Sequence, residues 1–188
     1  MMPPESLRDS PAISRSRLLD YVREVPDFPS PGILFRDITP LLADPRAFPS
    51  ALREMGDSWA EEPIDVVAAI EARGFILGAG LALALGAGFV PIRKEGKLPW
   101  QTNRAGYTLE YRSDVLQIHQ DAVRMGQRVL VVDDVIATGG TAAAAVELVE
   151  GLGGEVVGLQ FLIELSDLGG KAQLGGRRVE SVLVLSGE

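Results

Sequence analysis

Residues 129–141 read VLVVDDVIATGGT and decide the fold of this chain. Four apolar residues lead into two adjacent acids and a loop of glycine and hydroxyl residues, and the alanine-rich run 142–149 follows. A short apolar run bounded by turn residues is typical of a strand covered on both faces of a parallel sheet. The alanine-rich run has helical spacing and ends before a group of glycines. The segment therefore predicts a buried strand, a small loop and a helix N-terminus.

The two acids and the loop after them predict a ligand site. Ligands of open parallel sheets bind beyond the carboxyl ends of the strands, where we expect Asp133 and Asp134. Adjacent carboxylates only accept hydrogen bonds, so they suit the neighbouring hydroxyls of a sugar. The loop offers N–H groups at a helix N-terminus, which favours a phosphate, but it lacks the lysine of a Walker A motif. The plain alternative is that the acids only cap the helix.

The rest of the chain alternates between helical and extended patterns. Helices are expected at 13–25, 46–59 and 75–85, and further strands at 64–70, 88–93, 115–119, 156–163 and 179–185. This alternation predicts an α/β fold with a parallel sheet and right-handed crossovers. Residues 94–113 have no clear periodicity, and long loops of this kind are usually functional or disordered.

Length and charge exclude several functional classes. A chain of 188 residues fits one domain with a real core. A net charge of −8 disfavours nucleic acid, which requires a basic face. Basic residues still gather at Arg93, Lys94, Lys97 and Arg104, which suits a small anionic ligand. On charge alone, an ordinary solvated loop explains these residues better.

Absent residue types narrow the chemistry further. The chain has no cysteine, which excludes disulfides and cysteine zinc sites. Its one histidine, His119, cannot build a metal site or a Ser-His-Asp triad alone, and we expect a structural or surface role. No apolar run is long enough for a membrane span, and the polar N-terminal residues do not predict a signal peptide. We therefore expect a cytoplasmic protein that binds no membrane.

Four further segments carry a resemblance to a known family. They are FPSPGILFRDITP at 28–40, EARGF at 71–75, RKEGKLP at 93–99 and YTLEY at 107–111. Residues 129–141 resemble the phosphoribosyl-pyrophosphate (PRPP) signature of the type I phosphoribosyltransferases. The YTLEY and FRD strings resemble specifically the members that act on adenine. The family commonly has glycine directly after YTLEY, whereas this chain has Arg112. The difference affects the expected hinge of a flap over the active site.

The resemblance implies an architecture and a reaction. The fold is a type I phosphoribosyltransferase fold, a central mostly parallel sheet flanked by helices, in a single domain over residues 1–188. A small N-terminal hood spans about 1–40, and a mobile flap over the active site spans about 94–113. The implied reaction is purine salvage, in which adenine and PRPP give AMP and pyrophosphate.

The resemblance also implies the PRPP-binding residues. Asp133 and Asp134 hold the ribose hydroxyls, and Arg73 and Lys97 bind the pyrophosphate. Tyr111 helps to order the flap. The residues that cradle the 5-phosphate are Ala137, Thr138, Gly139, Gly140 and Thr141. Without the loop at 137–141, a surface ion pair between Arg73 and Glu71 would be the preferred expectation for that arginine.

Catalysis and base choice are assigned in the same way. Glu110 is implied to contact N7 of the purine and, with Arg73, to be catalytic. The main chain of Leu34 and Arg36 is implied to bind the adenine edge. Relatives that act on 6-oxopurines carry a lysine near the position of Glu164, and an acid there supports adenine.

The implied partners are small. Mg²⁺ is expected as the cofactor, held mainly through PRPP and water rather than by a dedicated protein site. A homodimer is expected by analogy with the family. Two other readings stay open: a phosphoribosyltransferase for another base such as xanthine or hypoxanthine, and a non-catalytic PRPP or nucleotide sensor.

Overall fold

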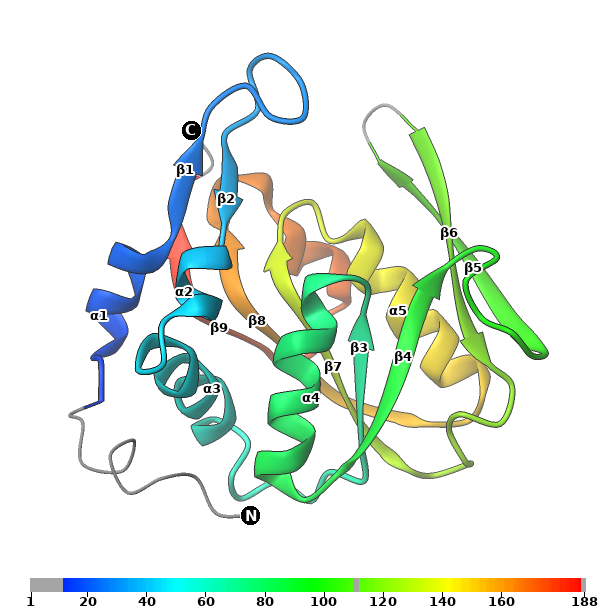
Figure 1. Ribbon diagram of the computed structural model, residues 1–188. Coiled ribbons are helices and arrows are strands. Elements are labelled where there is room, and N and C mark those ends of the chain that lie inside the picture. The colour runs from blue at the N-terminus through cyan, green and yellow to red at the C-terminus, as the bar shows by residue number, and fades with distance from the viewer. Residues whose placement is uncertain (1–11, 110–111, 187–188) are drawn as a thin grey trace.

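The computed structural model describes residues 12–109 and 112–186, and its centre is a seven-stranded sheet (Figure 1). The strand order is β5-β6-β4-β3-β7-β8-β9, in which the strands from β4 to β9 are parallel and β6 and β5 add an antiparallel edge. The bounds are β3 Val66–Ile70, β4 Gly88–Lys94, β5 Thr102–Leu109, β6 Arg112–His119, β7 Arg128–Ile136, β8 Glu155–Leu165 and β9 Val179–Leu185. The predicted α/β fold with a mostly parallel sheet is confirmed.

Helices cover both faces of this sheet (Figure 1). They are α3 Ala47–Asp57 and α4 Arg73–Leu85 on one face and α5 Gly140–Gly151 on the other. Alternation along β3 explains the two layers, because Val66 and Ala68 lie in the core cluster under α5, whereas Val67 and Ala69 lie in the cluster under α3 and α4. Among the described residues, no helix is both long and apolar enough to cross a membrane.

The central strand runs further than its apolar residues predicted. We expected it to end at Val132, but β7 continues to Ile136, so Asp133 and Asp134 are part of the strand. Parallel pairing with β8 continues to the end of β7, where Ile136 lies opposite Glu164. The neighbouring strand therefore keeps the backbone extended beyond the apolar run.

The N-terminal region forms a small separate layer. It consists of α1 Arg15–Leu18, a 3-10 turn η2 Leu19–Tyr21, β1 Arg23–Val25, β2 Phe35–Asp37 and α2 Thr39–Ala43. β1 and β2 pair antiparallel and lie above the carboxyl ends of the central strands (Figure 1). The single helix expected at 13–25 is wrong after Tyr21. Val25 precedes Pro26, and a residue before proline is disfavoured in the helical conformation.

Half of the stretch without periodicity lies in the strands of a β-hairpin rather than in a loop. β5 and β6 pair from Thr102↔His119 to Leu109↔Arg112, and the hairpin projects beyond the rest of the sheet (Figure 1). Its stability comes from pairing between neighbouring strands, which leaves little hydrophobic alternation in the sequence. The expectation of a long structureless segment is therefore wrong for residues 102–109 and 112–113.

Two short 3-10 turns follow β8 and were not predicted. They are η3 Ser166–Leu168 and η4 Gly170–Leu174. Leu174 is buried in the core cluster that contains Ile136 and much of α5. The turns thus bring residues 169–174 back to the loop between β7 and α5.

Candidate active site

Two neighbouring carboxylates lie at the carboxyl end of β7. Asp134 is buried and Asp133 is half-buried, and the Asp134 backbone N–H donates a 2.8 Å hydrogen bond to Asp133 Oδ1. Burial, and next to it repulsion by the Asp134 carboxylate, raises the pKa of Asp133 well above its usual value. Asp133 forms no ion pair with any described residue. The site therefore concentrates negative charge that hydroxyl donors or a cation would stabilise.

The first turn of α4 lies directly against this acid pair. A Cβ atom at Gly74 would lie 2.7 Å from Asp133 Oδ1 and 3.2 Å from the carbonyl oxygen of Val132. Only a residue without a side chain allows this approach. The helix expected from Phe75 begins at Arg73, so its N-terminus is beside the acids.

Arg73 connects the acid pair to the hood. Its Nε lies 2.6 Å from Asp134 Oδ2, and its guanidinium lies 4.7 Å from the centre of the Phe35 ring. The pKa of Asp37 is lowered, first by a hydrogen bond from the Thr39 backbone N–H and more weakly by the charges of nearby arginines, Arg73 included. The positive charge of Arg73 thus lies between the strand end and β2.

The loop after β7 encloses a cavity of about 100 Å³. α5 begins at Gly140, and Gly139 before it has a φ of +86°. The N–H groups of a first helical turn have no intrahelical partners, so they can bind an anion. The cavity is lined by Asp133, Val135, Ile136, Ala137, Thr138, Gly139, Thr141, Ala142 and Phe161. One acid and most of the predicted phosphate loop therefore border the same space.

The two residues expected at the adenine edge lie in the hood. Arg36 is in β2, and Leu34 is the residue directly before β2. Both residues are half-buried. Within the described ranges β2 pairs with β1 alone. The main-chain N–H and C=O groups along the other edge of β2 are therefore not hydrogen-bonded to a neighbouring strand. The Arg36 guanidinium forms an ion pair with Glu24, which is compatible with a role for its main chain.

Most of the expected basic patch is already paired with acids. The pairs are Arg93 with Glu71 at 2.9 Å, Lys94 with Asp114 at 3.1 Å and Arg104 with Glu95 at 3.3 Å. Glu71 therefore pairs with Arg93, and the alternative of an Arg73–Glu71 pair is wrong. Lys97 is exposed and forms no ion pair with the described residues. Of the four basic residues in this patch, it is therefore the one whose charge is available to an anionic ligand.

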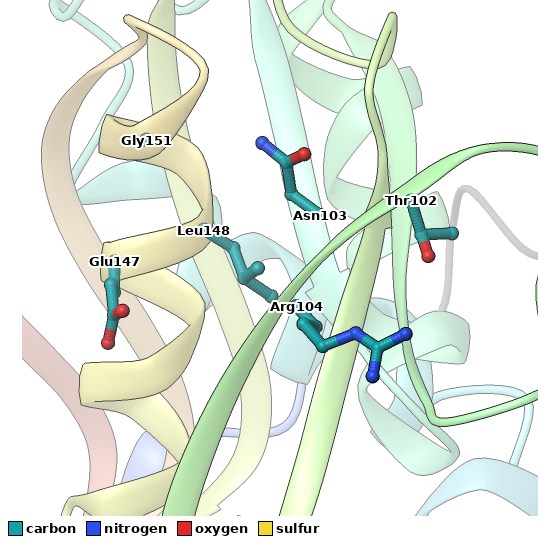
Figure 2. A pocket seen from close by; sticks show the side chains of 6 residues that line it. All are labelled: Thr102, Asn103, Arg104, Glu147, Leu148 and Gly151. Atoms are coloured by element: carbon teal, nitrogen blue, oxygen red, sulfur yellow. The ribbon is translucent and has the colours of Figure 1, made fainter.

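A larger hollow of about 340 Å³ lies between β5 and α5 (Figure 2). It is lined by Thr102, Asn103, Arg104, Glu147, Leu148 and Gly151. None of these is a predicted site residue, and the Arg104 guanidinium in it is paired with Glu95. The smaller cavity is the better candidate because it combines a carboxylate with a helix N-terminus.

Glu110 and Tyr111, expected to act on the base and to order the flap, lie outside the described residues. β5 ends directly before these two residues and β6 begins directly after them, with Leu109 opposite Arg112. Their predicted roles stay predictions.

Comparisons with known proteins agree with this geometry. The model of the phosphoribosyl transferase domain family matches residues 50–174. The adenine phosphoribosyltransferase of Rhodopirellula baltica is 56% identical over 91% of this chain and 83% of its own length. The crystal structure of adenine phosphoribosyltransferase from Rhodothermus marinus matches with a TM-score of 0.88 and 52% identity, over 91% of this chain and 98% of that one. The chain belongs to the adenine phosphoribosyltransferase family.

A third relative was solved as a complex with two small molecules. The Saccharomyces cerevisiae adenine phosphoribosyltransferase, complexed with D-2,5-dideoxy-2,5-imino-altritol 1,6-bisphosphate and adenine, matches with a TM-score of 0.85 and 42% identity, over 90% of this chain and 98% of that one.

Two residues that sequence analysis did not single out also shape this phosphoribosyltransferase site. Phe35 contacts the Arg73 guanidinium, and a Cβ atom at Gly170 would clash with the carbonyl oxygen of Ala137. Phe35 was visible only as part of the FRD string. The one signal for Gly170 was the glycine pair at 169–170, and nothing in the sequence connects that pair to residues 137–141.

Proposed function

We infer that this chain transfers the 5-phosphoribosyl group of PRPP to adenine, giving AMP and pyrophosphate in purine salvage. The observation that carries the inference is the cavity at the end of β7, where the Asp133 carboxylate and the loop 137–141 border one space. A sugar bearing a terminal phosphate matches both parts of that cavity. Family membership supports the choice of adenine as the base.

We propose that the acids and the loop hold the ribose 5-phosphate. Asp133 and Asp134 accept hydrogen bonds from the 2- and 3-hydroxyls, and residues 137–141 donate N–H and hydroxyl groups to the phosphate. The dipole of α5 adds about 0.3–2 kcal/mol to phosphate binding. Such positioning supplies about 7–11 kcal/mol in favourable reactions, and little covalent chemistry is asked of the protein.

Arg73 and Lys97 are proposed to bind the pyrophosphate as it leaves. N9 of adenine attacks C1 of the ribose with inversion, through a transition state that resembles an oxocarbenium ion. In the ligand-free chain the Arg73 guanidinium is paired with Asp134 at 2.6 Å. On PRPP binding, we expect this guanidinium to bind phosphate oxygens while the ribose hydroxyls bind Asp134, so that neither charge is left unpaired.

The hood and the hairpin are proposed to hold and activate the base. The main chain of Leu34 and Arg36 binds the adenine edge, and a 6-oxopurine would leave donors and acceptors there unpaired, at about 1–3 kcal/mol each. Glu110 aids proton removal from the base through N7, and Tyr111 orders the flap. Closure of residues 94–113 over the site would exclude water.

Magnesium fits the charge of this site. The Asp133 carboxyl group offers hard oxygen donors beside a second carboxylate, and PRPP adds further negative charge. No cluster of three or more potential metal ligands occurs in the described residues. We propose that PRPP carries Mg²⁺ into the site beside Asp133, where the ion would neutralise the departing pyrophosphate.

We propose a homodimer formed through the exposed face of α4. Ile76 is 45% exposed and Leu83 is 87% exposed, and Ala79 lies between them at helical spacing. A contiguous exposed apolar stripe is typical of protein–protein interfaces. We further propose a cytoplasmic protein of one domain, with a hood over about 1–40 and a flap over about 94–113.

A panel of bases tests the proposed reaction. Purified protein is incubated with PRPP, Mg²⁺ and adenine, hypoxanthine, guanine or xanthine, and pyrophosphate release is followed. We expect release with adenine and at least about 100-fold less with each 6-oxopurine. Preference for another base would make the chain a different phosphoribosyltransferase, and PRPP binding without release for any base would make it a sensor.

A further inference from the structure

A second backbone segment lies directly against the proposed phosphate loop, residues 137–141. This segment, residues 169–174, is called the buttress below. Gly170 is buried, and a Cβ atom on it would clash with the carbonyl oxygen of Ala137 and lie 3.0 Å from the backbone nitrogen of Gly139. The backbone of the buttress therefore touches the backbone of the loop.

The contact is reciprocal. A Cβ atom at Gly139 would clash with the carbonyl oxygen of Gly170 and lie 3.1 Å from Cβ of Gln173. Gly139 is thus required to be glycine by the buttress as well as by its left-handed backbone. Because the buttress fills the space beside Gly139, residues 137–141 cannot shift toward residues 169–174, and this restricts where the N–H groups of the loop can point.

An ion pair fastens the buttress to the sheet. Lys171 Nζ lies 2.7 Å from Glu164 Oε2, and the Glu164 side chain is only 13% exposed. Glu164 lies opposite Ile136, the last residue of β7 before the loop. Glu164 is the more buried partner, so removal of Lys171 would leave its carboxylate without this cation, and the pair restrains the buttress.

We propose that Gly170, Lys171 and Glu164 are positioning residues for the 5-phosphate of the substrate. They hold residues 137–141 from behind, and nothing requires them to touch PRPP. The inference rests on the proposed function, in which this loop binds the phosphate. Damage to the buttress should therefore weaken PRPP and AMP binding while the adenine subsite in the hood keeps its affinity.

Steady-state kinetics of Gly170→Ala and Lys171→Met test the proposal. We expect the KM for PRPP to rise at least about tenfold in Gly170→Ala and about three- to tenfold in Lys171→Met, with kcat and the KM for adenine within about twofold. Lys171→Arg keeps the charge and should restore the KM for PRPP. Should Gly170→Ala fail to fold, the half-exposed position 171 carries the test.

The controls separate this proposal from the one it rests on. Gly151→Ala is the matched glycine control, because a Cβ atom there meets nothing within 4 Å. Thr141→Val alters the loop itself. A raised KM for PRPP in Thr141→Val but not in Gly170→Ala or Lys171→Met would overturn the buttress role and leave the phosphate site standing. No effect in Thr141→Val would overturn both, and equal losses for PRPP and adenine would make the buttress merely structural.

Discussion

At the scale of the residue, the surroundings of Asp133 disfavour its charged form. Its carboxylate is half-buried beside Asp134 and has no cationic partner of its own among the described residues. Burial and the neighbouring charge of Asp134 raise the pKa of this carboxyl group well above its usual value. Groups with strongly shifted pKa values often lie at functional sites, because the strain is relieved by the ligand they bind.

Asp133→Asn should therefore stabilise the free protein and weaken PRPP binding. The amide keeps an oxygen for the Asp134 N–H but removes the buried charge, so we expect the Tm to rise by about 2–4 °C. The loss of a hydroxyl acceptor should raise the Kd for PRPP at least about tenfold. Thermal unfolding and calorimetric titration measure the two effects, and a lower Tm with normal affinity would contradict this account.

The same residue predicts a pH dependence with a definite sign. Its folded-state pKa is raised, so its contribution to stability is fully present below 3.8 and is lost as the pH rises through the raised value. The Tm advantage of Asp133→Asn over the unmodified chain should consequently grow with pH between about 4 and 8. Tm values of both proteins across that pH range provide the test. A Tm difference that does not change with pH would mean that titration of Asp133 does not affect stability.

Glu110 is predicted to act on the base rather than on PRPP. Glu110→Ala should lower kcat by about 10²–10⁴ because general acid–base assistance is lost, with the Kd for PRPP largely kept. Glu95→Gln, in the same region and paired with Arg104, is the control for a general charge effect. An unchanged kcat in Glu110→Ala would remove this residue from the mechanism.

At the scale of the element, the close approach of α4 to β7 sets the geometry of the acid pair. Gly74→Ala would place a Cβ atom 2.7 Å from Asp133 Oδ1, so the helix or the carboxylate must shift. We expect the KM for PRPP to rise at least about tenfold, since small displacements at reacting groups are costly. Gly56→Ala in α3, where a Cβ atom meets only Leu81 at 3.6 Å, should leave the kinetics unchanged. Equal KM values for the two variants would show that the approach is unimportant.

The elements that could be predicted are those with a strong local signal. β7 and α5 follow from an apolar run and an alanine-rich helix, and α3 and α4 were expected within a few residues of their bounds. The hairpin was predicted only in part: the alternating run 115–119 lies in β6, whereas β5 was missed because pairing between edge strands needs no hydrophobic alternation. α2 and the turns η3 and η4 are too short for periodicity to appear.

The part of the site that could be predicted is likewise the part with a strong local signal in the sequence. The acid pair and the phosphate loop are contiguous in sequence, and the structure places Asp133 and most of the loop around one cavity. Contacts between distant segments were not predictable, such as Arg73 with Asp134 or Gly170 with Ala137. They depend on which segments the fold brings together, which no local pattern encodes.

At the scale of the whole molecule, separate layers contribute the parts of the site. The sheet supplies the acids, the N-terminal layer supplies Phe35 and its neighbours, and the hairpin lies at the far edge of the sheet (Figure 1). At the site, Arg73 joins the first two layers, because it pairs with Asp134 and lies over the Phe35 ring. Binding of the two substrates is thus expected to be coupled through this side chain.

The proposed dimer is tested by a charge on the apolar face of α4. Leu83 is 87% exposed, so Leu83→Glu should not disturb the core of the protomer. In a dimer the new carboxylate would be buried without a partner, and we expect a weakening of association by at least about tenfold. Analytical ultracentrifugation measures the change, with Met125→Glu, 88% exposed and far from α4 in sequence, as the control. A dimer as tight as that of the unmodified chain would place the interface elsewhere.

The central claim is that the acid pair and the loop after it hold a ribose 5-phosphate, and a crystal structure with bound AMP tests it most directly. The account predicts that the phosphate lies within hydrogen-bonding distance of the N–H groups of residues 137–141 and that the ribose hydroxyls lie on Asp133 and Asp134. A phosphate bound elsewhere, with that loop empty, would contradict the claim.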